Sequence, residues 1–397
     1  MNTPYHLASK TAIVGVGSTR FEKRPERSGT SFLADAFVQA LADSGLRRQD
    51  IDGLIVQIGS PGGQDVDRVA EMLGIEARFC GQPWAHGMWT GSLLTEAAMA
   101  VHCGLANCVL VGRGASHTAP HGMAGTFGGA GDFEAMREGG GLTGEMPHWG
   151  MTSPGAGAAM AMQRYFSRYG GGSRELGAVA VALRKHAGLN PMAALRKPFT
   201  IDDYLASRFI TEPLRLLDYC QVSDGGACVI VTSTERARDL RKTPVLIAGV
   251  QGLSLGREEF VFSVPGLGVQ QQSTYTHKPR EHDLLAMRMA GIKTGDVDAF
   301  YTYDAFTPLV PFALERYGFV PTGEGLAWLQ GGRIEPGGEL PVNTHGGLHS
   351  EGHSSAWGAF VEMTRQLRGE CGERQVKDAK VAFWGPNFGN AVVLTRG

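Results

Sequence analysis

Short apolar runs alternate with amphipathic stretches over the first part of the chain. Runs rich in valine and isoleucine predict buried strands at residues 10–17 and 108–112, and residues 49–57 are predicted to be a loop that leads into a second strand. Apolar residues spaced three and four positions apart predict helices at residues 31–44 and 93–101. Strands that alternate with helices in this way are typical of an α/β fold.

The middle of the chain has a different texture. Residues 115–157 are rich in glycine and show little strand pattern, so we expect a long lid or binding loop there. Helices are predicted at residues 158–169 and 173–189. The segment Ser223-Asp-Gly-Gly is predicted to be a tight turn that leads into a strand at residues 227–231.

The opening pattern returns in the second part of the chain. Residues 242–250 repeat the apolar pattern of residues 10–16, and residues 295–302 repeat that of residues 49–56. The helix and strand at 91–112 are echoed by a helix and strand between 354 and 385. Three echoes in the same order predict two homologous halves, residues 1–240 and 241–397, with the 115–157 loop inserted in the first.

A cluster of three histidines and a glutamate lies among glycines at residues 343–358. We predict that a helix follows it, with Ser354 or Ser355 as N-cap. Its apolar face would consist of Ala356, Phe360, Met363 and Leu367. His353 would then lie at or just before a helix N-terminus, where the macrodipole favours a neutral imidazole. A glycine-rich turn with surface histidines is the alternative, but the clustering favours a site.

Composition and charge exclude several classes of protein. The formal net charge of −2 offers no basic field for nucleic acid. The six cysteines contain no C-x-x-C pair, so we expect reduced thiols in a cytoplasmic protein. No segment has the roughly 18 uninterrupted apolar residues of a membrane helix. No phosphate loop, H-E-x-x-H or dinucleotide fingerprint is present, so neither a bound metal nor a cofactor is expected.

Several motifs together resemble the sterol-carrier-type thiolases and their thiolase-like relatives. The motifs are His186-Ala-Gly-Leu-Asn-Pro191, Glu212-Pro-Leu-Arg-Leu-Leu-Asp218, Ser223-Asp-Gly, Tyr303-Asp-Ala-Phe306 and Gly346-Gly-Leu-His-Ser-Glu-Gly-His353. The resemblance covers essentially the whole chain. It implies an α/β fold of five layers, αβαβα, in which two similar halves sandwich central helices, and usually a homodimer.

Both positions of the catalytic thiolase cysteines depart from the family pattern. The helix that precedes the 108–112 strand begins within His86-Gly-Met-Trp-Thr-Gly-Ser92, which has no cysteine. The C-terminal position reads Trp384-Gly-Pro-Asn-Phe-Gly389. Thr90 or Ser92 would need a dedicated base to act as a nucleophile. Loss of both thiols indicates a protein that has abandoned acyl-enzyme chemistry.

Tyr303 marks a third departure. Its Tyr-Asp-x-Phe-Thr motif resembles the lipid-transfer-protein-like aldolases that shorten steroid side chains by retro-aldol cleavage of a β-hydroxyacyl-CoA. Those enzymes are thought to use this tyrosine and a second one, at the position where this chain has His353. The resemblance thus implies an acyl-CoA carbon–carbon lyase. A divergent thiolase or acyl-CoA C-acyltransferase and a non-catalytic acyl-CoA- or lipid-binding subunit remain alternatives.

The candidate site follows from these motifs. We expect Tyr303 to be the general acid/base and His353 its partner or an oxyanion donor, with His345 a weaker candidate. A phenol whose ordinary pKa is about 10 needs a lowered pKa or a relay, and nothing in the sequence identifies either. Predicted substrate-binding residues are Gly346, Gly347, His148 and Trp149.

A partner protein is also implied by the resemblance. Relatives of this subgroup often work with a small protein that carries a zinc ribbon and an OB-fold. This chain has no zinc-ribbon spacing of its own. We therefore expect a heteromeric complex in which the small protein contributes to acyl-CoA binding.

Overall fold

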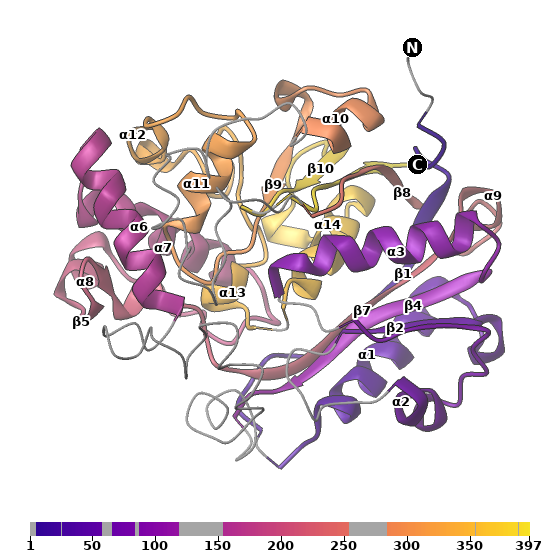
Figure 1. The fold of residues 1–397 in the computed structure, drawn as a ribbon. Helices are drawn as coiled ribbons and strands as arrows, with labels where there is room; N and C mark the ends of the chain where they lie inside the picture. Colours follow the sequence, from indigo (N-terminus) through magenta and orange to yellow (C-terminus); the bar gives the residue numbers. More distant parts are fainter. Residues whose placement is uncertain are drawn as a thin grey trace, which may run out of the picture.

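Figure 1 shows the chain as a computed structural model, which describes residues 5–24, 26–57, 66–83, 87–118, 154–253, 284–353, 355–387 and 389–397. Most of its strands join one mixed sheet in the order β3-β2-β4-β7-β1-β8-β11-β10-β9. Their bounds are β1 (Thr11–Ser18), β2 (Gly53–Val56), β3 (Phe79–Gly81), β4 (Cys108–Ser116), β7 (Asp224–Ser233), β8 (Val245–Val250), β9 (Ala299–Tyr301), β10 (Val381–Trp384) and β11 (Val392–Arg396). A separate small hairpin consists of β5 (Phe209–Thr211) and β6 (Leu214–Arg215).

The sheet consists of two sets of strands that follow the same kind of order from the middle of the sheet to each edge. On one side of the middle, β1 is followed by β7, β4 and β2, and on the other β8 is followed by β11, β10 and β9. Among the described residues the two sets pair where Ala12 lies opposite Leu246 and Ile13 opposite Val245. This arrangement agrees in kind with the repeated pattern of the sequence, while the exact boundary near residue 240 stays a prediction.

Helices cover both sets of strands and also lie between them. α1 (Gly29–Ser44) and α2 (Val66–Leu73) pack on β1, β2, β4 and β7, and α10 (Leu285–Ala290) packs on β8 and β11. α3 (Thr90–His102) and α14 (Trp357–Arg368) contact strands of both sets (Figure 1). The layers therefore follow the order αβαβα, and the predicted α/β fold class is confirmed.

The remaining helices form a second region beside these layers, at the left of Figure 1. α7 contacts α8, α12 and α13, and α12 in turn contacts α11. Their bounds are α6 (Pro154–Tyr169), α7 (Ser173–Gly188), α8 (Ile201–Ala206), α11 (Leu309–Arg316), α12 (Gly325–Trp328) and α13 (Gly347–Ser350); α9 (Thr234–Ala237) lies apart from them and follows β7.

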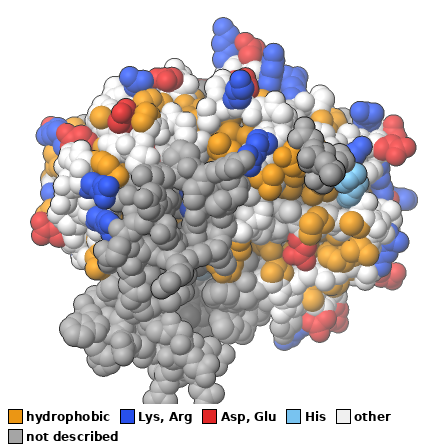
Figure 2. Space-filling model, turned by 45° about the horizontal axis from the view of Figure 1, so that its top comes forward, with side chains coloured by type: hydrophobic (Ala, Val, Ile, Leu, Met, Phe, Trp, Pro, Cys, Tyr) orange, Lys and Arg blue, Asp and Glu red, His pale blue; other side chains and the backbone are white. Residues whose placement is uncertain are grey.

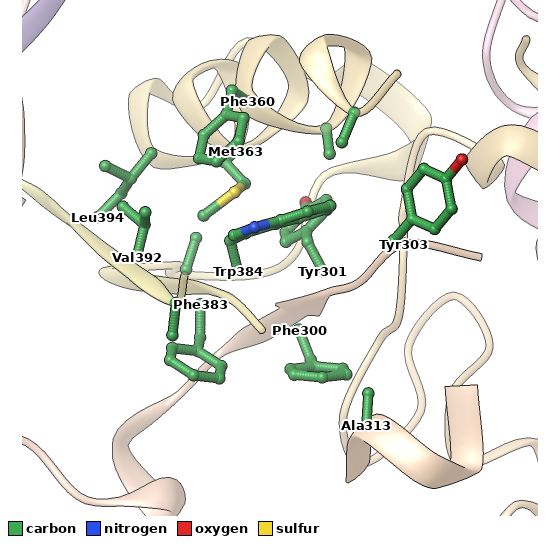
Figure 3. Close-up of a cluster of buried hydrophobic side chains, with 14 of the residues drawn as sticks. Phe300, Tyr301, Tyr303, Ala313, Phe360, Met363, Phe383, Trp384, Val392 and Leu394 are labelled. Atoms are coloured by element: carbon green, nitrogen blue, oxygen red, sulfur yellow. The ribbon is translucent and has the colours of Figure 1, made fainter. Parts of the chain in front are cut away.

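An aromatic cluster fills the space between α14 and the second set of strands. Figure 3 shows Phe360 and Met363 of α14 above Phe383 and Trp384 of β10, and all four side chains are buried. The residues predicted for the apolar face of this helix, Ala356, Phe360, Met363 and Leu367, are all buried, but Ala356 precedes the helix and α14 is buried on most of its sides. In the same view, Tyr303 directs its hydroxyl away from the cluster.

The surface shows no field of one sign over the described residues in view. Lysines, arginines, aspartates and glutamates are interspersed on the face in Figure 2, in keeping with the net charge of −2. Within the described ranges no helix combines the length and the apolar character needed to cross a membrane.

The predicted turn at Ser223-Asp-Gly-Gly is wrong. Asp224, Gly225 and Gly226 already belong to β7, where they pair with Ser116, Ala115 and Gly114 of β4. Both glycines face close neighbours: a Cβ on Gly226 would lie 2.5 Å from the carbonyl carbon of Phe32 in α1, and one on Gly225 would lie 2.4 Å from the ring of Phe21. The ends of the predicted 115–157 loop are also wrong, since residues 115–116 are in β4 and 154–157 are in α6. Residues 119–153 lie outside the described residues.

The predicted serine N-cap of α14 is also wrong. The helix begins at Trp357 after Ala356, which makes no side-chain cap. Ser355 has a φ of 60° and its hydroxyl accepts a hydrogen bond from Arg113 instead, while Ser354 lies outside the described residues. His353 therefore precedes the helix by several residues, and the helix macrodipole, which acts within the first turn, is not the main influence on its ring.

Candidate functional site

Tyr303 and His353 meet in the interior. The phenol oxygen of Tyr303 lies 3.1 Å from Nε2 of His353 in a hydrogen bond, and the two rings meet edge to face. Both side chains are buried, with exposed fractions of 4% and 6%. The structure thus brings together the two residues that the sequence predicted as acid/base and partner.

Hydrogen bonds between two loops position Tyr303 against His353. Asn343, at the start of the glycine- and histidine-rich segment, exchanges two hydrogen bonds of 3.0 Å with the backbone of Thr302, next to Tyr303. One residue beyond Tyr303, Asp304 accepts from the backbone N–H of Leu348 at 3.0 Å. The loop after β9 is therefore tied at two points to the segment that ends in His353.

Gly347 permits the second of these ties. Its φ is +64°, and a Cβ at this position would overlap a carboxylate oxygen of Asp304. Gly346 also packs closely, because a Cβ there would lie 2.6 Å from the Cβ of Ala187. Packing accounts for both glycines, and their predicted role in substrate binding stays a prediction.

A second histidine lies behind His353. The ring of His117, which follows β4, lies 5.1 Å from that of His353 between centroids. Its Nδ1 is 3.0 Å from the carbonyl oxygen of Ser223 and its Nε2 is 3.2 Å from Nη2 of Arg113. Because a carbonyl only accepts and a guanidinium only donates, Nδ1 carries the proton and Nε2 accepts. Ser223 also accepts from the backbone N–H of His353 at 2.8 Å, which links the two histidines.

Arg113 lies in β4 with its guanidinium buried between His117 and Ser355. Burial lowers the pKa of Arg113 to about 10, and its attraction to Tyr303 partly offsets this effect. Burial, with a smaller contribution from the Arg113 charge, lowers the pKa of His117 to about 3. At neutral pH the pair is therefore a cation held by a neutral imidazole.

The phenol of Tyr303 experiences opposing influences. Burial raises its pKa well above the usual value, and Cys220 and Asp304 act in the same direction, whereas Arg113 lowers it. Burial also raises the pKa of the Cys220 thiol to about 12, so this cysteine stays protonated at neutral pH. A thiol in that state is a poor nucleophile.

The start of α3, where a thiolase would carry its nucleophile, is packed against Tyr303. A Cβ on Gly87 would lie 2.7 Å from a ring carbon of Tyr303 and 3.1 Å from its hydroxyl. The Thr90 hydroxyl donates to the carbonyl of Gly87 at 2.6 Å, a local helix contact. Ser92 is directed into buried surroundings without a hydrogen-bond partner among the described residues. Neither hydroxyl has a base beside it in the described structure.

His345 lies in a different buried cluster. Its ring stacks on Tyr301 with centroids 6.0 Å apart, and its Nε2 is 3.8 Å from the carboxylate of Glu351. Asn190 donates both to that carboxylate, at 2.9 Å, and to the carbonyl of His345, at 2.8 Å. Burial raises the pKa of Glu351. His345 therefore belongs to a separate buried cluster with Tyr301, Glu351 and Asn190, and its catalytic role stays a prediction.

The third histidine of the segment is structural. His349 lies between the Asp304 carboxylate, 3.0 Å from Nδ1, and the carbonyl of Asp218, 2.9 Å from Nε2. The predicted loop residues His148 and Trp149 lie outside the described residues. In the part of the chain that the structure describes, no group of three histidine, cysteine or acidic side chains is placed to hold a metal ion.

Sequence reasoning missed Arg113 and His117. The signal for Arg113 was present, because it is the one charged residue in the otherwise uncharged run Cys108–Ser116. A charged residue in a buried strand is rarely there without a partner or a task. His117 gave no such signal, since its partners Ser223 and Arg113 are brought together only by the pairing of β4 with β7.

Comparisons with known proteins identify the relatives of this chain. The family described as "Thiolase C-terminal domain-like" matches residues 269–392. A 17-hydroxy-3-oxo-4-pregnene-20-carboxyl-CoA lyase of Mycobacterium tuberculosis is 37% identical over 378 residues, which are 91% of this chain and 92% of the relative. A steroid side-chain-cleaving aldolase of Thermomonospora curvata is 36% identical over 375 residues, 91% of each chain.

Solved structures give the same result. The chain is similar to the Ltp2-ChsH2(DUF35) aldolase, with a TM-score of 0.85, 32% identity and 98% of each chain covered. Human mitochondrial 3-ketoacyl-CoA thiolase shares the fold at a TM-score of 0.68 and 15% identity, over 98% of this chain and 100% of that one. With a family match, relatives above 30% identity over nine-tenths of its length and this fold, the chain belongs to the thiolase superfamily, alongside its acyl-CoA lyases and steroid side-chain aldolases.

Proposed function

We propose that this protein is an acyl-CoA carbon–carbon lyase that cleaves a β-hydroxyacyl-CoA by a retro-aldol reaction. The observation that carries the proposal is the buried Tyr303–His353 hydrogen bond, in a thiolase fold that has no cysteine at either catalytic cysteine position. The lyase and aldolase among its relatives support the same reaction class.

The reaction needs a base and a group that stabilises an enolate, but no nucleophile. Ionised Tyr303 takes the proton of the β-hydroxyl group. The Cα–Cβ bond then breaks, the hydroxyl carbon becomes a ketone or aldehyde, and the electron pair of the bond forms the thioester enolate. The imidazole of His353 donates a hydrogen bond that stabilises this enolate. Tyr303 returns the proton to Cα, which yields the shorter acyl-CoA and restores the phenolate, so no cofactor is required.

A divergent thiolase that uses another thiol is the second candidate, and the retained His353 favours it. The chemistry at Cys220 argues against it. Cys220 interacts electrostatically with Tyr303, but burial raises the pKa of its thiol to about 12. A reactive thiolate needs the opposite environment.

A non-catalytic acyl-CoA-binding role predicts tight CoA-ester binding without turnover.

The substrate and the assembly are part of the proposal. We infer a CoA thioester with a bulky apolar acyl group, because one relative is named for a steroid carboxyl-CoA and another for a steroid side chain. We also infer a small DUF35-type partner, by analogy with the Ltp2-ChsH2(DUF35) aldolase. A zinc ribbon and an OB-fold within that partner, and a homodimeric core in the cytoplasm, complete the proposed assembly.

The experiment is an assay for ketone release from branched β-hydroxyacyl-CoAs, with the partner protein supplied. Tyr303→Phe is expected to lower kcat by a factor of about 10² to 10⁴, the usual contribution of general acid–base catalysis. Tyr301→Phe is the matched control: this neighbouring buried tyrosine bonds to Thr344 at 2.6 Å, outside the acid/base pair. Full activity in Tyr303→Phe would remove Tyr303 from the mechanism.

A further inference from the structure

We propose that Arg113 is the positioning residue that stabilises the ionised form of Tyr303 and thereby sets the pH range in which Tyr303 acts as a base. The inference deepens the proposed function and rests on it for the role of Tyr303. It answers a requirement of the chemistry, since a buried phenol is a base at neutral pH only if something favours its anion.

The first observation is that Arg113 is a buried cation with no anionic partner among the residues that the structure describes. Its guanidinium donates to the Ser355 hydroxyl and to Nε2 of His117, and both acceptors are neutral. Within the described ranges no carboxylate lies at ion-pair distance from it, unlike the buried guanidinium of Arg368, which meets Asp43 at 2.7 Å. Burial of an unpaired charge is costly. The positive charge is therefore available to an anion that forms during catalysis.

The second observation is that Arg113 approaches Tyr303 through two neighbours. A Cβ on Gly87 would lie 3.1 Å from both the Tyr303 hydroxyl and the Cα of Ser355, so these two atoms are at most about 6 Å apart. Ser355 is also the residue whose hydroxyl holds Arg113. On the other side, His117 joins Arg113 to the ring of His353, which bonds to the phenol.

The third observation concerns the other titratable groups around Tyr303. Cys220 precedes β7 and is a protonated thiol. Asp304, on the loop of Tyr303 itself, would oppose the phenolate, but it is occupied by His349 and the backbone N–H of Leu348. His117 is neutral, and His353 bonds to the phenol directly. Among these described neighbours only Arg113 lowers the pKa of Tyr303.

The network also fixes where the charge lies. The tautomer of His117 is set by its hydrogen bond to the Ser223 carbonyl, and this leaves Nε2 to accept from Arg113. Ser223 in turn accepts from the backbone of His353. Ser223 therefore positions His353 directly and Arg113 through His117. This network keeps the guanidinium in place when the phenol of Tyr303 ionises.

The experiment compares the pH dependence of kcat/KM for the complex containing the natural chain, Arg113→Gln and Arg113→Lys. The rising limb of this profile reports the ionisation of the essential base in the free enzyme. Removal of the charge raises the pKa of Tyr303, so the limb of Arg113→Gln moves to higher pH and activity at pH 7 falls about tenfold or more, recovering in alkaline buffer. Arg113→Lys keeps the limb close to its natural position.

Three further measurements separate this role from a structural one. Replacement of Tyr303 by a fluorinated tyrosine, whose phenol is more acidic, should restore activity to Arg113→Gln at neutral pH. Arg184→Gln, which removes a partly buried guanidinium bonded to Ser350 at 2.8 Å, should leave the limb unmoved. If Arg113→Gln does not fold, Ser355→Gly removes the anchoring hydroxyl at a φ that glycine accepts, and a smaller shift in the same direction is expected.

A uniform loss of activity at every pH, with the limb unmoved, would overturn the proposal. The ionisation of Tyr303 is also measured without turnover, as the tyrosinate absorbance difference between each protein and its Tyr303→Phe counterpart. An equal pKa of Tyr303 with and without Arg113 would overturn the inference as well. Absence of lyase activity in the natural complex would instead count against the proposed function, and the absorbance titration would still decide the role of Arg113.

Discussion

At the scale of single residues, the interior beside α13 holds two carboxyl groups in different states. Glu362 pairs with Arg374 at 2.9 Å, and despite burial the pKa of this carboxyl lies below its usual value. Glu351 receives one hydrogen bond from Asn190, and its other oxygen has no hydrogen-bond partner among the described residues. Burial is the dominant influence on Glu351, and its pKa is raised.

This difference predicts how Glu351→Gln changes stability with pH. A carboxyl whose pKa is raised in the folded protein stabilises it below the unfolded pKa of about 4, and that contribution is lost as pH rises through the folded pKa. Glutamine keeps the shape without the ionisation. We expect Glu351→Gln to raise the free energy of unfolding at pH 8 relative to the natural chain and to have little effect at pH 5, in urea titrations at both pH values.

Exposed Glu373 provides the control for this comparison. Glu373→Gln should leave the difference between the two pH values unchanged. If Glu351→Gln destabilised the protein equally at pH 5 and pH 8, the ionised carboxylate would be the form that the fold requires.

The acid/base pair could be predicted from the sequence because its residues lie in two motifs with family resemblance. The contacts of Arg113 and His117 could not, since their partners Ser355 and Ser223 are 242 and 106 residues away in the chain. The predicted N-cap of α14 was wrong because a contact distant in the sequence also decides the role of Ser355. Ser355 has the right type for a cap, but a buried guanidinium competes for its hydroxyl, and tertiary contact decides the outcome.

At the scale of elements, α1 packs on β4 and β7 at glycine positions. A Cβ on Gly114 would overlap the carbonyl oxygen of Gly29, and one on Gly226 would lie 2.5 Å from the carbonyl of Phe32. The obstructing atoms belong to the helix backbone, which cannot move aside as a side chain can. This close crossing fixes the height of α1 above the two strands that carry Arg113 and lead from Ser223.

Gly226→Ala is therefore expected to destabilise the fold by at least about 3 kcal/mol, at the upper end of the cost of overpacking. Chemical denaturation of the variant would measure this loss. Gly295→Ala is the matched control, because an added Cβ meets nothing within 4 Å there, and its effect should stay within about 0.5 kcal/mol. Equal stability of both variants would mean that α1 can shift outward at little cost.

The fold class could be predicted more fully than its details. Apolar periodicity located β1, β4, α3, α7 and α14 because each is a long element with one buried stripe or a wholly buried run. The start of β7 was missed because Asp224-Gly-Gly is typical of a turn in isolation. It forms a strand because Asp224 is satisfied by the N–H groups of Thr118 and Arg24, which only the folded chain supplies.

At the scale of the whole molecule, the proposed partner leads to a prediction about assembly. If a small DUF35-type protein contributes to acyl-CoA binding, the lone chain should show low lyase activity, and addition of the partner should raise kcat/KM at least about tenfold. Mixing should also raise Tm, since a ligand that binds only the folded state stabilises it. Size-exclusion chromatography measures the association and thermal unfolding measures the change in Tm. Full activity of the lone chain without association would contradict the prediction.

The contact between Gly87 and Tyr303 has a consequence for the side chain that residue 87 can carry. Any side chain larger than hydrogen at residue 87 would intrude on the phenol ring, in the segment where a thiolase keeps its nucleophile. A mutation that placed a cysteine at position 87 would therefore displace the phenol of Tyr303. A side chain at residue 87 and the present position of Tyr303 exclude each other, so a nucleophile at this point of the segment would require the tyrosine to move.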